Sequence, residues 1–228
     1  TEAVFEVQFL RLASVNYSNN YWESQGVRGT GVWDLGWGFN VPTEELVNAY
    51  EVNDPRKEAT ILFSGQNEGN GLTLPASPPL AQPYWNKKAY TTPSIRQGYG
   101  QNKNHWINIK ILRYADVILM AAEAANELGN SATASGYIEM IRARARGNNA
   151  SILPKVTAMD QSSLRDAIKQ ERRIEFAMEG ERFYDLVRWG DAENVLGGLG
   201  YQSRSQFYPI PQTAIDQSGG VLIQNPNY

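Results

Sequence analysis

Two glutamates one helical turn apart, Glu171 and Glu175, are the residues of this sequence best spaced for acid–base chemistry. Glycoside hydrolysis uses such a pair, with one carboxyl group as the acid and the other as base or nucleophile. The spacing of Leu164, Ile168 and Met178 predicts an amphipathic helix, and both glutamates complete its apolar stripe. Carboxylates on the buried side of a helix must be paired, or they take up a proton.

The arginines near these glutamates favour a structural role over a catalytic one. Nearby guanidinium groups lower the pKa of a carboxyl, whereas a general acid needs a raised pKa. We therefore predict an ion-pair network that holds the two C-terminal helices together. Catalysis by Glu171 and Glu175 remains the alternative. The predicted network consists of Arg113, Glu171, Arg172, Glu175, Glu179, Arg182, Asp185, Arg188 and Trp189.

Composition excludes several other kinds of site. The sequence has no cysteine, which rules out disulfides, thiolate nucleophiles and cysteine-bound metals. The single histidine, His105, excludes sites that need two imidazoles, and no nucleophile is recognisable beside it. Asp34 and Asp54 could join a calcium site, but no run of ligands of the EF-hand type surrounds them. We therefore predict no cofactor and no metal. A formal net charge of -3 also gives no case for nucleic acid as a partner.

The aromatic side chains outside the expected helices point to a ligand. Residues 13–40 and 84–99 are rich in tyrosine and tryptophan among polar residues. Flat rings bind the apolar faces of sugars, while amide and charged side chains bind the hydroxyl groups. The competing interpretation is that Trp33, Trp37 and Trp106 cover the core, because tryptophan is highly buried on average. The predicted ligand-binding residues are Tyr17, Tyr21, Trp22, Trp33, Tyr84 and Trp85.

The elements that would position the aromatic residues are short. Alternation over residues 3–10 predicts a strand with Phe5, Val7 and Phe9 on the face toward a core. Residues 13–40 show no period and are predicted to form a long irregular loop. After it we expect a helix over 42–50 with Thr43 as N-cap, a turn at 54–56, a strand over 59–63 and turn-rich sequence over 64–105.

The second half of the sequence is predicted to be helical. Apolar residues at steps of three and four predict one helix from Ile111 to a stop at Gly129 and a second over 132–146. Small residues on both helices allow close approach, as in a tetratricopeptide-type hairpin. We expect this hairpin to pack on a segment outside the sequence or on the C-terminal helices. Asp160 is the N-cap candidate of the next helix, and Gly180 separates it from the last one.

Short motifs along the chain form a recognisable combination. Near the C-terminal end they are Glu171-Arg172, Glu175, Glu179-Gly180, Arg182, Asp185-Leu186 and Arg188-Trp189. Earlier in the chain they are residues 4–9, Gly36-Trp37-Gly38, Pro42-Thr43, Leu46, Tyr50-Glu51 and Asp54-Pro55-Arg56-Lys57. The combination resembles the SusD/RagB family of nutrient-binding lipoproteins of the bacterial outer membrane.

This resemblance implies a mainly α, SusD-like fold with a few short strands and long irregular loops. Residues 1–228 would form a single C-terminal region, loop-rich over 1–110 and helical with an extended tail over 111–228. An N-terminal helical-repeat half is expected outside this sequence.

The resemblance also implies a function. It is the non-catalytic binding of oligosaccharides or polysaccharides at the cell surface, for delivery to a SusC-like TonB-dependent outer-membrane transporter. A lipid anchor outside this chain would be the only attachment to the outer membrane. The alternatives are the glutamate-pair enzyme and a helical-repeat module that binds only protein.

Overall fold

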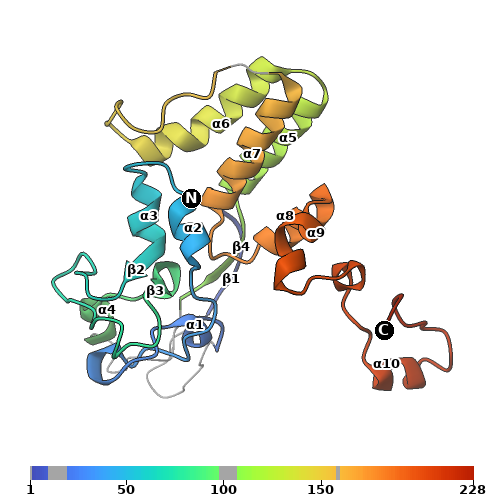
Figure 1. Cartoon of the computed structure of the whole chain (residues 1–228), viewed down its shortest axis with the longest axis horizontal. Coiled ribbons are helices and arrows are strands. Elements are labelled where there is room, and N and C mark those ends of the chain that lie inside the picture. The colour runs from blue at the N-terminus through green and yellow to red at the C-terminus, as the bar shows by residue number, and fades with distance from the viewer. Residues whose placement is uncertain (1, 10–19, 98–106, 158–159) are drawn as a thin grey trace. The chain divides into compact units, whose positions relative to one another are not determined.

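A computed structural model describes residues 2–9, 20–97, 107–157 and 160–228 (Figure 1). The chain forms two compact units, Thr1–Met178 and Glu179–Tyr228. The strands are β1 (Ala3–Val7), β2 (Ile61–Phe63), β3 (Tyr84–Asn86) and β4 (Ile109–Arg113). The helices of the first unit are α1 (Asn20–Gln25), η1 (Gly31–Trp33), α2 (Glu44–Ala49), α3 (Pro55–Thr60), η2 (Lys87–Ala89), α4 (Pro93–Gln97), α5 (Tyr114–Glu127), α6 (Ser131–Arg146) and α7 (Gln161–Glu175).

Helices α5, α6 and α7 lie side by side and confirm the predicted helical hairpin (Figure 1). Ala122 of α5 and Ala134 of α6 are fully buried, and these small side chains let the two helices approach closely. Leu164 and Ile168 of α7 pack into the same cluster. The apolar side of the hairpin is therefore covered by a C-terminal helix of this chain, which is one of the two expected arrangements.

The ends of these helices follow the sequence signals closely. The Asp160 carboxylate accepts hydrogen bonds from the backbone N–H groups of Ser162 and Ser163, both at 3.0 Å, and caps α7 as predicted. Gly180 has φ 96°, the left-handed conformation expected of the stop. However, α7 ends at Glu175, and Met178 lies beyond it with φ 67°, so Met178 does not belong to the helical stripe.

The start of the hairpin differs from the prediction. Residues 109–113 form β4, antiparallel to β1 with Val7 opposite Ile109, and α5 begins only at Tyr114. Ile111 lies in this strand at a register shift, between Lys110 opposite Glu6 and Leu112 opposite Phe5. The pairing of its neighbours with β1 overrides a four-residue spacing that merely continues that of α5. Phe5 and Val7 are 58% and 40% exposed, so their predicted burial against a core is wrong for the described residues.

The first half of the chain contains more regular structure than predicted. Helix α1 lies inside the segment predicted as irregular loop. Asp54 begins helix α3 rather than a turn, because its carboxylate accepts the N–H of Arg56 while Pro55 occupies the first helical position. The cap by Thr43 on α2 is confirmed. Strands β2 and β3 pair antiparallel, and their core cluster contains Val27, Trp33, Leu35, Leu62, Leu74, Leu80 and Trp85.

The second unit consists of short helices and an extended tail. Its helices are α8 (Arg182–Trp189), α9 (Ala192–Leu196), η3 (Gly197–Leu199), η4 (Ser203–Gln206) and α10 (Gln212–Gln217). Within α8, the Arg188 Nε donates to Asp185 at 2.9 Å and the guanidinium lies 4.6 Å from the centre of the Trp189 ring. Across both units, none of the helices in the described ranges has the length and apolar character needed to cross a membrane.

Candidate functional site

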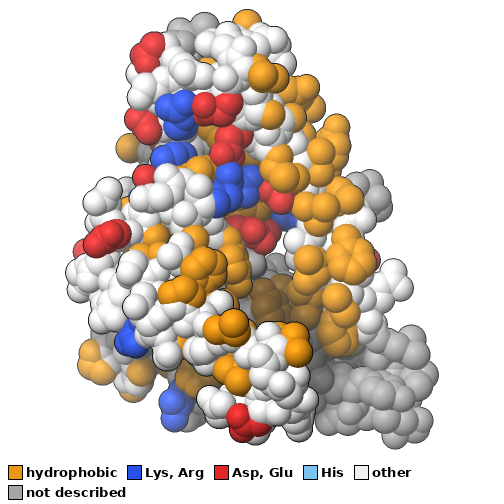
Figure 2. All heavy atoms as spheres, turned by 90° about the vertical axis from the view of Figure 1, so that its right-hand side faces the viewer, with side chains coloured by type: hydrophobic (Ala, Val, Ile, Leu, Met, Phe, Trp, Pro, Cys, Tyr) orange, Lys and Arg blue, Asp and Glu red, His pale blue; other side chains and the backbone are white. Residues whose placement is uncertain are grey.

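Glu175 lies at the centre of a buried ion-pair network. Its carboxylate accepts hydrogen bonds from Arg113 Nη1 at 2.9 Å and from Arg144 Nη2 at 2.5 Å. Arg113 ends β4 and Arg144 belongs to α6, so one carboxylate joins α7 to two other elements. On the face shown in Figure 2, acidic and basic side chains lie next to one another in a band.

Glu171 repeats this arrangement one turn earlier. It accepts from Arg56 Nη1 at 2.5 Å and from Arg142 Nη1 at 3.1 Å. Arg56 is also held by Asp54, and Arg142 forms a bidentate pair with Glu51 at 2.6 and 2.9 Å. The network thus connects α7 to α3 and α6 through charge-assisted hydrogen bonds, which are stronger than neutral ones.

The pKa of Glu175 is lowered, whereas a general acid needs a raised pKa. Burial acts to raise this pKa, but the hydrogen bonds and charges of Arg144 and Arg113 outweigh burial and hold it below its usual value. A carboxyl kept ionised cannot deliver a proton near neutral pH. The geometry therefore favours the structural interpretation of the glutamate pair.

The residues of the predicted network are divided between the two units. Within the first unit, Arg113 binds Glu175, and Arg56 contacts both Glu175 and Glu171. Arg172 binds Asp116 at 2.6 Å. Glu179, Arg182, Asp185, Arg188 and Trp189 belong to the second unit. Sequence reasoning missed Arg56, Arg142 and Arg144. Only Arg56 carried a signal, since it follows the Asp54-Pro55 step, while the arginines of α6 look like ordinary solvent-facing helix residues.

Two of the predicted ligand-binding rings lie in the core. Trp33 is 5% exposed and stacks on Tyr90 at 6.1 Å, and Trp85 is 1% exposed with its Nε1 donating to Ser64 Oγ. Neither presents an open ring face, so the expected stacking role is corrected for both. The polar residues around them in the sequence give no sign of this burial. Tyr84 is half-buried with its ring edge-on to Phe63, and Tyr17 lies outside the described residues.

Four other rings reach the surface from one backbone frame. Tyr21 is exposed and lies edge-to-face with half-buried Trp22 at 5.0 Å. Trp37 and Phe39 are 44% and 60% exposed and form a second edge-to-face pair at 6.1 Å. We call Tyr21, Trp22, Trp37 and Phe39 the aromatic surface. From the sequence, Trp37 is weighed only as a core residue, and Phe39 is not singled out.

The frame under the aromatic surface is unusually tight. The backbone N–H groups of Trp37 and Phe39 donate to the carbonyls of Glu23 and Ser24 at 3.0 and 2.8 Å, and Trp22 Nε1 donates to the Ile107 carbonyl at 2.9 Å. A Cβ atom at Gly26 would lie 2.3 Å from the Leu35 carbonyl oxygen, and one at Gly36 would lie 2.0 Å from that of Glu23. Only glycine fits where these two backbones meet.

Comparison with known proteins gives a consistent set of similarities. A model of the SusD family matches residues 1–206. A SusD-like protein of Formosa agariphila is 27% identical, and the match covers 100% of this chain and 48% of the relative. The structure of a laminarin-binding SusD-like protein has 29% identity and a TM-score of 0.76, over 100% of this chain and 50% of that one.

A further structure shows the same fold with a ligand present. Surface glycan-binding protein A from Bacteroides thetaiotaomicron, in complex with laminarihexaose, is 24% identical with a TM-score of 0.72. The match covers 100% of this chain and 52% of that one. The chain therefore spans about half the length of the proteins that it matches.

Proposed function

The chain belongs to the SusD family, and on this premise we propose that it binds oligosaccharides or polysaccharides without cleaving them. The observation that carries the proposal is the aromatic surface. Three of its rings, Tyr21, Trp37 and Phe39, are exposed on a frame fixed by backbone hydrogen bonds. Rigid rings lose little conformational freedom on binding, which favours affinity for a sugar face.

The polar residues beside the rings suit a carbohydrate. Arg28 is exposed, and its side chain lies against Gly38, next to Trp37. Exposed Asn40 is held by a hydrogen bond from its amide nitrogen to Gln25 at 2.6 Å. Rings flanked by a few oriented polar groups are the composition expected of a small-ligand site. The names of two similar structures, one laminarin-binding and one with laminarihexaose, point in the same direction.

The absence of catalysis is part of the proposal. Glu171 is bound by two guanidinium groups and Glu175 by three, so neither carboxylate is free to act on a glycosidic bond. We further propose that the protein lies at the outer membrane of a bacterial cell, held by a lipid anchor and delivering glycans to a SusC-like TonB-dependent transporter. Family membership supports this location and this partner.

The test is a binding screen with the intact 228-residue chain. Affinity gels containing laminarin, starch or cellulose derivatives identify the polysaccharide, and calorimetry with the matching hexasaccharide gives the affinity. Trp37→Ala should weaken binding by about 2 kcal/mol or more, the loss typical of a ring at the centre of a contact. Tyr208→Ala, which removes an exposed ring of the second unit, is the matched control and should leave the affinity unchanged.

Two outcomes would contradict the proposal. Binding that is unaltered in Trp37→Ala and Phe39→Ala places the glycan elsewhere. Release of shorter sugars by the parent chain, abolished in Glu175→Gln, would instead establish the enzyme.

A further inference from the structure

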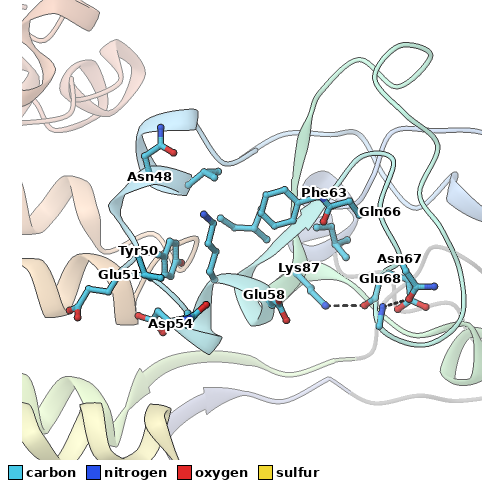
Figure 3. Close-up of a pocket in the computed structure, with 17 residues that line it drawn as sticks. Asn48, Tyr50, Glu51, Asp54, Glu58, Phe63, Gln66, Asn67, Glu68 and Lys87 are labelled. Atoms are coloured by element: carbon cyan, nitrogen blue, oxygen red, sulfur yellow. Dashed lines mark hydrogen bonds between the residues drawn. The ribbon is translucent and has the colours of Figure 1, made fainter. Parts of the chain in front are cut away.

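The first unit also contains a pocket that is separate from the aromatic surface. The pocket has a volume of about 670 Å³ and is lined by residues of α2, α3, strand β2 and the loop that follows β2 (Figure 3). In this view the ring of Phe63 lies between Asn48 and Gln66. None of the four rings of the aromatic surface lines the pocket. Pockets of 300–1,000 Å³ are the usual size for small ligands.

One wall of the pocket is held rigidly by a buried carboxylate. Glu68 is 2% exposed, and its carboxylate accepts from the backbone N–H groups of Asn70 and Leu72 and from the Asn70 side chain. Lys87 Nζ donates to the Glu68 carbonyl at 2.9 Å, which ties η2 to this loop (Figure 3). The Asn67 side chain accepts from Gly69. The wall is thus ordered before any ligand arrives.

The charges of the opposite wall are already neutralised. Glu51 is held by Arg142, and Asp54 by Arg56, from outside the pocket. Glu68 is committed to its own loop. The charged lining residues that remain are Lys57 and Glu58 on α3 together with Lys87, so opposite charges lie side by side. A strongly charged ligand would meet a like charge within the same site, which costs free energy.

The groups left for a ligand are amides and an apolar floor. Within the described residues, the side chains of Asn48, Asn53 and Gln66 make no hydrogen bond to the protein. Each amide offers both a donor and an acceptor. Val47 and Phe63 are among the apolar residues that line the pocket beside them. A neutral polyhydroxylated ring matches this set, since its hydroxyl groups both donate and accept while its C–H face is apolar.

We propose that this pocket is a second carbohydrate subsite, selective for a neutral sugar residue. The class of ligand rests on the proposed function, while the site is independent of the aromatic surface. Asn48 and Gln66 bind hydroxyl groups from opposite sides, and Phe63 supports the ring. Two subsites on one rigid unit raise the apparent affinity for a glycan long enough to reach both.

The test follows backbone amide chemical shifts of the isotope-labelled 228-residue chain during titration with laminaribiose, cellobiose, maltose and glucuronic acid. A neutral disaccharide should shift residues 47–54 and 66–69. The double variant Asn48→Ala/Gln66→Ala should weaken the binding that these shifts report by at least about tenfold, the effect of losing two hydrogen bonds. Asn148→Ala/Gln217→Ala makes the same changes at exposed positions outside the pocket and should bind like the parent.

The outcomes separate this site from the proposed function. Shifts confined to residues 21–39 overturn the pocket and leave the function standing. Shifts in the pocket alone support the subsite and contradict glycan binding at the aromatic surface. If no sugar causes a shift, both the subsite and the proposed function are contradicted. If glucuronic acid binds more strongly than the neutral disaccharides, the selectivity for a neutral sugar is contradicted. If the double variant unfolds, Asn48→Trp replaces it and should block the pocket by bulk.

Discussion

At the scale of single residues, Glu175 carries a prediction about stability. Its side chain is almost fully buried between Arg113 and Arg144. Glu175→Ala removes the buried carboxylate that Arg113 and Arg144 share, and breaking such a buried pair costs about 3–5 kcal/mol. The melting temperature should therefore fall by many degrees, measured by circular dichroism. Glycan affinity, measured well below that temperature, should not change. A variant as stable as the parent would show that the network does not hold the fold together.

The same carboxyl group makes stability depend on pH. Because the pKa of Glu175 is lower in the folded state than in the unfolded chain, its contribution is fully present above the ordinary glutamate pKa of about 4.3. That contribution is lost as pH falls toward the folded-state value. Melting curves between neutral and acidic pH should show a steeper loss for the parent than for Glu175→Gln. Parallel curves for the two proteins would mean that another group causes the acid sensitivity.

These residues could be predicted only where their environment is set by neighbours in the sequence. Burial of Glu171 and Glu175 follows from their place on the apolar stripe of one helix. Their partners do not follow, because Arg56 and Arg142 approach from elements distant in the sequence. The buried state of Trp33 is equally non-local, since it depends on Leu74, Leu80 and Trp85. Residue types alone predicted an aromatic site, and tertiary packing decided which of the rings remain exposed.

At the scale of elements, the boundary between β4 and α5 predicts a large loss of stability for one isoleucine substitution and a small loss for another. Ile118 is buried beside Phe176, whereas Ile111 in the strand is 53% exposed. Ile118→Ala should cost about 2–5 kcal/mol, the range for a buried aliphatic side chain. Ile111→Ala should cost less than about 1 kcal/mol, because most of its surface already meets solvent. Denaturant titrations measure the free energy of unfolding of both variants. Equal losses would support the helix predicted from the sequence to begin at Ile111.

Elements with their own end signals were predictable. Helices α6 and α7 combine a stripe, a capping Asn130 or Asp160, and a break after the last turn. Helix α1 and strand β4 lack such signals and exist through partners far along the chain. Long-range pairing therefore marks where local sequence reasoning failed.

At the scale of the whole molecule, exposed apolar residues on β1 and β4 should be detectable in solution. Val4 and Phe5 on β1 and Ile111 on β4 are each more than half exposed. Such residues on neighbouring strands favour dye binding and association. The chain should increase the fluorescence of a hydrophobic dye, and Phe5→Thr/Ile111→Thr should reduce the increase without lowering stability.

The control for the dye experiment is Val52→Thr, which removes an exposed apolar residue from a turn away from these strands. It should leave the fluorescence close to that of the parent. Equal reductions in both variants would show that the strands form no continuous apolar area.

The glycine contact under the aromatic surface has a consequence for how selectivity can change. Since the backbones at Gly26 and Gly36 touch, the separation between the ring-bearing segments is set by main-chain geometry and not by side-chain packing. Exchanging one ring for another would therefore change the contact with a bound ligand but not the distance between the two ring-bearing segments. If the aromatic surface binds glycans as proposed, substitutions of its rings would change the preferred monosaccharide, while the spacing of sugar residues along the polymer would stay fixed.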